Sequence, residues 1–217
     1  MIPGTKVVDG WTIPENDVRG FGWIREDLDL VPQVLRHVRK FTSCVQAGGN
    51  VGLYPDRLAK DFIKVVTFEP QPLLFQCLCH NLQKHHNTFE MPFALSNHSG
   101  KKVGLKMTDF GNMGTWLVYP GSDRSLVQAD TMTIDQLNLK RLGLIWLDIE
   151  GYEITALMGA IKTIRQHRPV IALEIKDHGD QFGFSEADAT QWVKNQGYKI
   201  AEKVKDDLVF VPCESAG

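Results

Sequence analysis

The sequence contains few cysteines, and their spacing excludes the usual cysteine-based sites. The four cysteines, Cys44, Cys77, Cys79 and Cys213, form neither a C-x-x-C pair nor a disulfide framework. They therefore predict reduced thiols, as in a cytoplasmic protein. Cys77 and His80 stand three residues apart on a predicted helix and could touch one metal ion, but packing residues are the better interpretation.

Long apolar runs and an excess of charge are also missing. No stretch reaches the roughly 20 residues that a helix needs to span a bilayer, and no secretory signal opens the sequence. The formal net charge is only −2, which gives no general attraction for nucleic acid or an anionic membrane. A local basic patch is still compatible with this balance. We expect a cytoplasmic protein without membrane or nucleic-acid partners.

The dinucleotide-binding fingerprint G-x-G-x-x-G is absent where it should stand. Residues 45–54 predict a buried strand, a glycine turn and the start of a helix. Read from Gly48 or from Gly49, both later glycine positions of the fingerprint are occupied by other residues. The turn instead contains Gly48, Asn50 and Gly52, a poor cradle for a pyrophosphate. It favours a nucleoside cofactor without a phosphate, such as S-adenosylmethionine.

An acidic residue ends the next predicted strand, residues 64–69. Glu69 stands about 20 residues after the glycine turn, where nucleotide-binding α/β folds place the acid that binds the ribose hydroxyls. The two oxygens of a carboxylate suit the two hydroxyls of a diol. Pro70 and Gln71 follow directly and are expected to flank the adenosine.

Strands and helices alternate along most of the chain. Further strands are predicted at 89–95, 144–148 and 170–174, and helices at 29–40, 54–61, 72–84, 154–164 and 185–195. The last two alternating runs, 199–203 and 208–211, predict a terminal antiparallel hairpin. This order predicts an α/β fold with a mostly parallel, seven-stranded sheet covered by helices on both faces. The length, 217 residues, suits a single domain.

Two segments depart from this alternation. Residues 1–27 are rich in turn-forming residues and carry Trp11, Phe21 and Trp23, which predicts an irregular flap over a core edge or over the ligand site. Residues 101–134 contain short alternating runs punctuated by glycines, which predict a β-rich insertion of two or three strands. Both segments are expected to determine which substrate is accepted.

Taken in order, the motifs of this chain resemble those of the FkbM family of class I methyltransferases and, within it, a short phage-type member. The resemblance covers residues 43–176 and rests on V-Q-A-G-G-N-V-G at 45–52, F-E-P at 68–70, A-L-S-N-H-S-G at 94–100, T-I-D at 133–135, L-D-I-E-G-Y-E at 147–153 and R-P-V-I-A-L-E at 168–174. Each motif alone is weak, whereas the ordered series is specific. The resemblance implies a Rossmann-like methyltransferase fold with S-adenosylmethionine as the methyl donor. It also implies a hydroxyl acceptor on a sugar or small metabolite.

The resemblance also implies a set of cofactor-binding residues at the ends of the strands. They are Gln46, Gly48, Gly49, Asn50, Gly52, Glu69, Pro70, Gln71, Ser96, Asn97 and Asp148. Ser96 or Asn97 is expected to read the adenine amine, and Asp148 to face the methionine amino group, the acceptor or a metal. The family commonly has an aspartate where Gln46 stands. Because glutamine carries no charge, this departure predicts a reduced affinity for the cofactor.

Methyl transfer to a hydroxyl needs an in-line approach and a group that takes the proton. The catalytic candidates are Asp148, Glu150, Glu174 and His178, which follow the ends of two neighbouring predicted strands. Glu150 and Glu153 have a second interpretation, as acids that stabilise a helix start. Asp148, Glu150 and Glu174 together could hold Mg²⁺, which prefers oxygen ligands. We do not favour a metal here, because the spacing in the sequence does not by itself establish a third ligand.

Three other functions remain open at this point. A non-catalytic module would keep the fold and bind the cofactor without transferring a methyl group, and Gln46 gives this alternative some weight. A nucleotide-dependent oxidoreductase is disfavoured by the failed fingerprint and by the terminal hairpin. A methyltransferase acting on nucleic acid or protein is the third, although Asp148 is not followed by the N/D-P-P-Y-type motif of enzymes that methylate bases. We expect a small-molecule or glycan acceptor and a monomer or small homo-oligomer, in the host cytoplasm if a phage encodes it.

Overall fold

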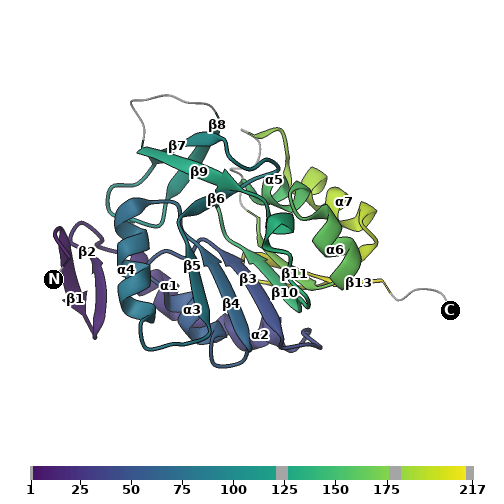
Figure 1. The fold of residues 1–217 in the computed structure, drawn as a ribbon, viewed down its shortest axis with the longest axis horizontal. Helices are drawn as coiled ribbons and strands as arrows, with labels where there is room; N and C mark the ends of the chain where they lie inside the picture. Colours follow the sequence, from purple (N-terminus) through teal and green to yellow (C-terminus); the bar gives the residue numbers. More distant parts are fainter. Residues whose placement is uncertain (1, 121–126, 176–181, 214–217) are drawn as a thin grey trace.

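A seven-stranded sheet forms the centre of the computed structural model, which describes residues 2–120, 127–175 and 182–213. Its strand order is β12-β13-β11-β10-β3-β4-β5 (Figure 1). The strands are β3 (Ser43–Ala47), β4 (Lys64–Phe68), β5 (Thr88–Met91), β10 (Leu144–Leu147), β11 (Val170–Glu174), β12 (Tyr198–Val204) and β13 (Asp207–Pro212). The five strands from β5 to β11 pair in parallel, and β13 is antiparallel to both of its neighbours. The predicted sheet and terminal hairpin are confirmed.

Helices cover both faces of this sheet, because alternate residues of each strand point to opposite faces. In β3, Cys44 packs with α2 (Val31–Leu35) and α3 (Leu53–Leu58), whereas Val45 packs with α5 (Glu153–Met158), α6 (Ile161–His167) and α7 (Glu186–Asn195). The remaining helical elements are α1 (Gly20–Asp27), α4 (Pro72–Leu82), and the short 3₁₀ turns Leu28–Leu30 and Ile134–Leu137. In the described ranges, no helix has the length and apolarity needed to cross a membrane.

The strand predicted at 89–95 is divided between two sheets. Pro92 separates β5 from β6 (Phe93–Leu95), because proline has no N–H to donate to a continuous ladder. β6 belongs to a four-stranded sheet of order β6-β9-β7-β8, with β7 (Lys102–Met107), β8 (Trp116–Pro120) and β9 (Val127–Met132). Figure 1 shows this small sheet beyond one end of the main sheet. The predicted insertion therefore pairs with β6 to form a second, separate sheet.

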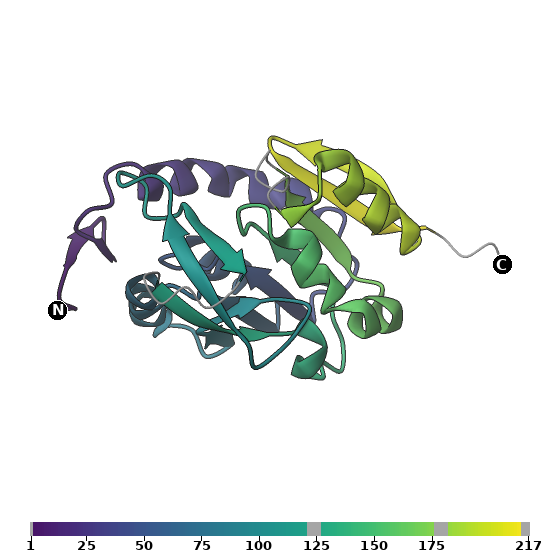
Figure 2. The same cartoon turned by 90° about the horizontal axis from the view of Figure 1, so that it is seen from above.

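The N-terminal segment is more regular than its turn-rich sequence predicts. A hairpin of β1 (Thr5–Val8) and β2 (Trp11–Pro14) precedes α1, so the prediction of an irregular segment over residues 1–27 was wrong. Asp9 and Gly10 both have positive φ, 50° and 83°, which is the two-residue turn that an Asp-Gly pair favours between antiparallel strands. Figure 2 shows this hairpin and the β12–β13 hairpin at opposite ends of the molecule, with α1 and α2 in line between them.

Two predicted helices are shorter than expected. The helix predicted at 29–40 consists of a 3₁₀ turn followed by α2, which ends at Leu35. The helix predicted at 154–164 is interrupted between α5 and α6 at Gly159, where a Cβ atom would lie 2.1 Å from the backbone oxygen of Ser96. The Asp135 carboxylate accepts the N–H groups of Lys162 and Thr163 and so begins α6. Close packing against another strand end, which periodicity does not reveal, causes the break.

Candidate functional site

The glycine turn after β3 is held between two neighbouring strands. Gly48 has φ 82°, and a Cβ atom on it would lie 2.0 Å from the backbone oxygen of Asp148 at the end of β10. On the other side, the Gly49 N–H donates to the backbone oxygen of Phe68 at the end of β4, at 2.8 Å. Gly52, with φ 106°, forms the N-cap of α3. Glycine is required at Gly48 by both its conformation and the space around it.

The Glu69 carboxylate is fixed by the backbone on both sides. Its Oε2 accepts the Asn50 N–H and its Oε1 accepts the Gln71 N–H, each at 2.8 Å. The side chain is only 5% exposed, and this burial raises the pKa of Glu69 to about 7, although both hydrogen bonds act in the opposite direction. Each oxygen accepts about two hydrogen bonds when ionised. One acceptor position on each oxygen is thus left for a pair of hydroxyl groups.

Gln46 supports the glycine turn from below. Its Nε2 donates to the backbone oxygens of Ala47 and Gly48, each at 3.0 Å, and its Oε1 accepts the Thr67 hydroxyl at 2.5 Å. The side chain is buried and is not among the residues that line the cavities described below. An ionised aspartate here could not donate to the two carbonyl groups. The glutamine is therefore matched to this turn, and its predicted contact with a cofactor stays a prediction.

Two adjoining cavities meet at the glycine turn and Glu69. The first, of about 210 Å³, is polar and is lined by the turn, Glu69 and the acidic residues at the ends of β10 and β11. The second is a narrow, mainly apolar slot lined by Phe68, Pro70, Leu74, Phe93, Leu95, Trp116, Val118, Ile149 and Tyr152. Gly48, Glu69, Asp148 and Glu150 line both cavities. The arrangement suits a flat apolar ring in the slot, a diol at Glu69 and a polar chain along the glycine turn.

Some predicted cofactor residues lie away from these cavities. Ser96 is buried with its hydroxyl 3.5 Å from that of Tyr152, and Asn97 is exposed in a shallow depression beside Thr133 and Gln136. Gln71 is buried, and its Oε1 accepts the Leu74 N–H as the N-cap of α4. None of the three is among the residues that line either cavity. Tyr152 and Trp116, which do line the slot, were missed because nothing in their local sequence distinguishes them from core residues.

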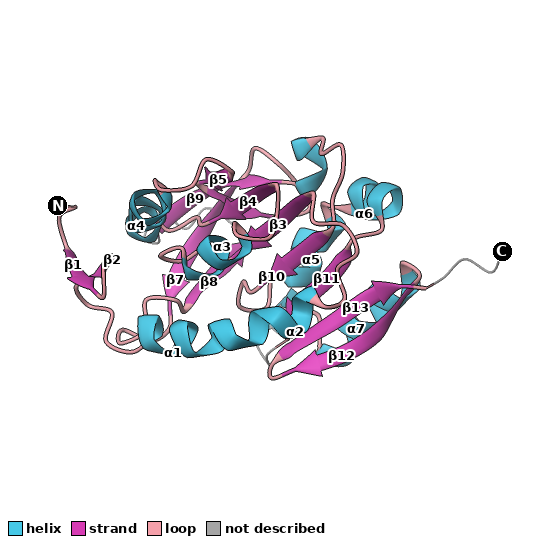
Figure 3. Ribbon diagram, turned by 90° about the horizontal axis from the view of Figure 1, so that it is seen from below, coloured by secondary structure: helices cyan, strands magenta, loops and turns pink. Residues whose placement is uncertain are grey.

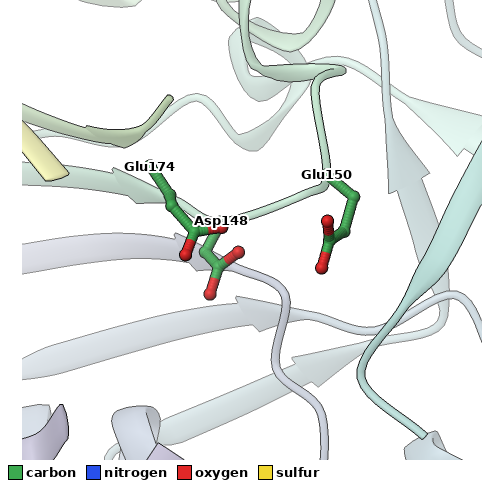
Figure 4. A group of neighbouring side chains, drawn as sticks. All are labelled: Asp148, Glu150 and Glu174. Carbon is green, nitrogen blue, oxygen red and sulfur yellow. The ribbon is translucent and has the colours of Figure 1, made fainter. Parts of the chain in front are cut away.

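Three carboxylates meet at the ends of two adjacent strands. Asp148 follows β10, Glu174 ends β11, and Glu150 comes from the loop beyond β10, and oxygen atoms of all three lie within 4.8 Å of one another. Figure 4 shows Asp148 and Glu174 side by side, with the Glu150 carboxylate across from them. Such a cluster is suited to a divalent cation and equally to hydrogen bonds from hydroxyl groups. The sequence-based preference against a metal stays a prediction. His178 lies outside the described residues, so its catalytic role stays a prediction.

The loop that carries Glu150 is held by a buried acid at the start of α5. Glu150 itself has φ 56°, a conformation that only a few non-glycine residues adopt. Glu153 Oε1 accepts the N–H groups of the two residues that flank Glu150, from Ile149 at 2.9 Å and from Gly151 at 3.1 Å. Burial raises the pKa of Glu153 to about 7. Glu153 is thus a positioning residue for Glu150.

Glu153→Ala is expected to lower the free energy of unfolding by about 2 kcal/mol, because the partly buried N–H groups of Ile149 and Gly151 lose their acceptor. It is also expected to weaken binding of S-adenosylhomocysteine, since the loop beside the slot is released. Glu153→Gln, which keeps an acceptor oxygen, should restore most of both properties. Urea unfolding and calorimetric titration measure the two effects.

Asp135→Ala is the matched control, because Asp135 also accepts two backbone N–H groups at a helix start but lies outside both cavities. The Asp135→Ala variant should lose stability but keep the affinity of the unmodified protein for S-adenosylhomocysteine. Equal affinities for Glu153→Ala and the unmodified protein would contradict the positioning role.

The N-terminal segment and the insertion meet above the polar cavity. Asp17 joins them: its Oδ1 accepts the N–H groups of Gly20 and Met113, each at 3.1 Å, and its Oδ2 accepts the Phe21 N–H at 2.8 Å. An ion pair of 2.6 Å between Arg19 and Asp109 adds to the contact. Gly20, Trp23, Ile24 and Asp27 of α1, with Asn112 and Gly114 of the insertion, line the cavity. Figure 3 shows α1 on the same side of the molecule as β7 and β8.

Comparisons with known proteins agree with this architecture. The family model of the methyltransferase FkbM domain matches residues 46–200. No curated protein sequence matches the chain. The FkbM methyltransferase structure from Methylobacillus flagellatus KT has a TM-score of 0.55 and 18% identity, over 79% of this chain and 44% of that one. The chain thus spans less than half the length of that relative.

Two further solved structures are similar in fold. Magnesium protoporphyrin IX methyltransferase from Synechocystis PCC 6803, with bound S-adenosylmethionine, has a TM-score of 0.50 and 13% identity, over 87% of this chain and 79% of that one. The Methanococcus jannaschii fibrillarin pre-rRNA processing protein has a TM-score of 0.51 and 13% identity, over 95% and 86%. These likenesses show the Rossmann-like class I methyltransferase fold. Because the family model covers most of the chain, the protein belongs to the FkbM methyltransferase family.

Proposed function

We propose that this protein is an S-adenosylmethionine-dependent methyltransferase that acts on a hydroxyl group of a sugar or small metabolite. The observation that carries the proposal is the position of Glu69, fixed by two backbone N–H groups where the apolar slot meets the glycine turn. A nucleoside needs both an apolar surface for its base and an acceptor for its ribose hydroxyls. Family membership supports the same cofactor.

The chain's own residues fit S-adenosylmethionine in three places. The slot between Phe93, Leu95 and Trp116 would hold the adenine, and Glu69 would accept both ribose hydroxyls. The glycine turn, which lines the polar cavity with Gly48, Gly49 and Asn50, would contact the methionine portion. When bound, this cofactor supplies a methyl group on a positively charged sulfur. The carboxylates of Glu69, Asp148, Glu150 and Glu174, which line the polar cavity, favour that positive charge.

The acidic cluster would receive the acceptor. Asp148, Glu150 and Glu174 can accept hydrogen bonds from neighbouring hydroxyl groups, and one of them would take the proton that the reacting oxygen loses. Helix α1 and the insertion, which Asp17 joins by hydrogen bonds to both, form a roof over the polar cavity. This roof would exclude water and orient the acceptor. Several carboxylates in a polar cavity favour a polyhydroxylated acceptor over an apolar one.

The non-catalytic alternative loses its main support. Its weight came from Gln46, but the amide group of this glutamine is hydrogen-bonded at both ends, through Nε2 to the backbone oxygens of Ala47 and Gly48 and through Oε1 to the Thr67 hydroxyl. A macromolecular acceptor remains a second candidate, favoured only by the exposed Trp23 and Phe110 near the roof. A cytoplasmic location, a phage-type origin and a monomer or small homo-oligomer are also proposed on the sequence alone.

Calorimetric titration with S-adenosylhomocysteine, with NAD as the control ligand, tests the cofactor. We expect micromolar binding of the first and none of the second. Binding of NAD instead, or of neither, would contradict the proposal. Transfer of a radioactive methyl group to hydroxylated sugars and small metabolites, compared with RNA and protein substrates, then tests the acceptor.

A further inference from the structure

A second large cavity lies at the opposite end of the main sheet. It has a volume of about 580 Å³ and is floored by Leu142, Gly143 and Val170, where β10 and β11 begin. The methyl-transfer cavities lie where the same strands end. The two sites are therefore separated by the length of the strands, and a ligand in one does not contact the other. The volume is in the range of cavities that take small molecules.

The walls of this cavity are basic. They carry Arg36, Arg39, Lys40, His167, Arg168 and Lys199, and no described aspartate or glutamate lines it. These side chains come from three parts of the chain: the segment after α2, the end of α6 and β12. In a protein with a net charge of −2, this convergence gives the cavity a local excess of positive charge. Stabilisation of helix C-termini explains the cations after α2 and α6 singly, but not Lys199 on a strand.

Part of the wall is rigidly held. Arg168 donates through Nη1 to the Gln196 backbone oxygen at 2.7 Å and through Nη2 to that of Gly197 at 2.5 Å, and its guanidinium lies 4.5 Å from the Tyr198 ring centroid. Arg36 is hydrogen-bonded to the Glu202 carboxylate, which neutralises some charge on one side. The ammonium groups of Lys40 and Lys199 make no ion pair within the described residues. They are the cations most available to a ligand.

We propose that this cavity binds a phosphate-bearing small molecule with at least two phosphate groups, such as a nucleoside diphosphate or triphosphate. Arginine and lysine groups converging on one cavity fit several closely spaced phosphate charges. The site is a bounded cavity rather than a long basic stripe, and the acidic cluster at the other end of the sheet opposes an extended polyanion. This binding site is independent of the proposed methyl transfer.

Titration with inorganic pyrophosphate, ATP and single-stranded RNA, at 50 and 200 mM salt, tests the proposal. We expect saturable binding of pyrophosphate and ATP that weakens with salt. The double variant Lys40→Glu/Lys199→Glu should weaken it at least tenfold. The matched control Lys101→Glu/Lys162→Glu changes two exposed lysines outside the cavity and should leave the affinity within twofold. Thermal unfolding of each variant checks that it is folded.

Four outcomes would overturn the proposal. Three of them are the absence of saturable pyrophosphate binding, an equal loss of affinity in both double variants, and displacement of pyrophosphate by S-adenosylhomocysteine, which would place it in the methyl-transfer cavities. RNA binding that is tighter than ATP binding and is lost in Lys40→Glu/Lys199→Glu would replace the small molecule by a nucleic acid. None of these readouts uses methyl transfer, so a failure here leaves the proposed function untouched.

Discussion

Gly48→Ala is expected to abolish binding of S-adenosylhomocysteine and to lower the free energy of unfolding by about 3 kcal/mol. The new Cβ atom would lie 2.0 Å from the backbone oxygen of Asp148, so a strand end has to move. The positive φ of 82° adds about 1–2 kcal/mol for any residue other than glycine, and overpacking of this kind adds about 1–3 kcal/mol. Because the turn forms the floor of both cavities, the displacement removes the site and not only stability.

Gly143→Ala is the matched control for this substitution. Its Cβ atom would lie 1.8 Å from the backbone oxygen of Lys40, but at the opposite end of the sheet. It should lose stability to a similar extent while its folded fraction keeps its affinity for S-adenosylhomocysteine. Urea unfolding measures the stability. Calorimetric titration at a temperature below the thermal unfolding midpoint measures the affinity. Normal affinity in Gly48→Ala would show that the glycine turn is not part of the ligand site.

Glu69→Ala is expected to weaken binding of S-adenosylhomocysteine by about 1–3 kcal/mol, which corresponds to about 5-fold to 150-fold in the dissociation constant. It removes the proposed acceptor of the ribose hydroxyls and also the acceptor of the Asn50 and Gln71 N–H groups. Glu69→Gln keeps one acceptor oxygen and loses the charge. Its affinity for S-adenosylhomocysteine should lie between that of the unmodified protein and that of Glu69→Ala. Asp56→Ala, which removes a buried acid paired with Lys84 and His85 outside the cavities, should not change the affinity.

The same residue should give the affinity a pH dependence. Burial raises the pKa of Glu69 to about 7, and two ribose hydroxyls donate better to the ionised form. Affinity for S-adenosylhomocysteine should therefore rise between about pH 5 and pH 7 and then level off, and this rise should be absent in Glu69→Gln. A pH-independent affinity in the unmodified protein would remove the ionised carboxylate from the ribose site.

Stability should change in the opposite direction over the same window. The folded pKa values of Glu69 and Glu153, about 7, are above their ordinary value of 4.5, so the folded state binds more protons than the unfolded state between those limits. The contribution of the two residues to the free energy of unfolding is full below about pH 4.5. It is lost as the pH rises towards 7. Urea unfolding at several pH values should show a shallower fall in Glu69→Gln.

The local sequence by itself determined the elements that periodicity and turn chemistry encode. The glycine turn after β3, the acid at Glu69, the parallel strands and the terminal hairpin were all predictable, because each depends on neighbouring residues in the chain. The Asp9-Gly10 hairpin carried an equally clear local signal that the turn-rich composition obscured. Pro92 and Gly159 each divided an element that periodicity alone made continuous.

Only the tertiary structure decided which side chains meet. The order of the strands brings Asp148 and Glu174 together from positions 26 residues apart, and the left-handed backbone at Glu150 turns a third carboxylate towards them. Asp17 meets Met113 across 96 positions of the chain to form the roof. Burial turned Glu153 into a support for its loop. The fold, and not burial, brought the exposed Lys40 and Lys199 to one cavity wall. Such convergence depends on long-range pairing and on the exclusion of water, and neither leaves a periodic signal in a single sequence.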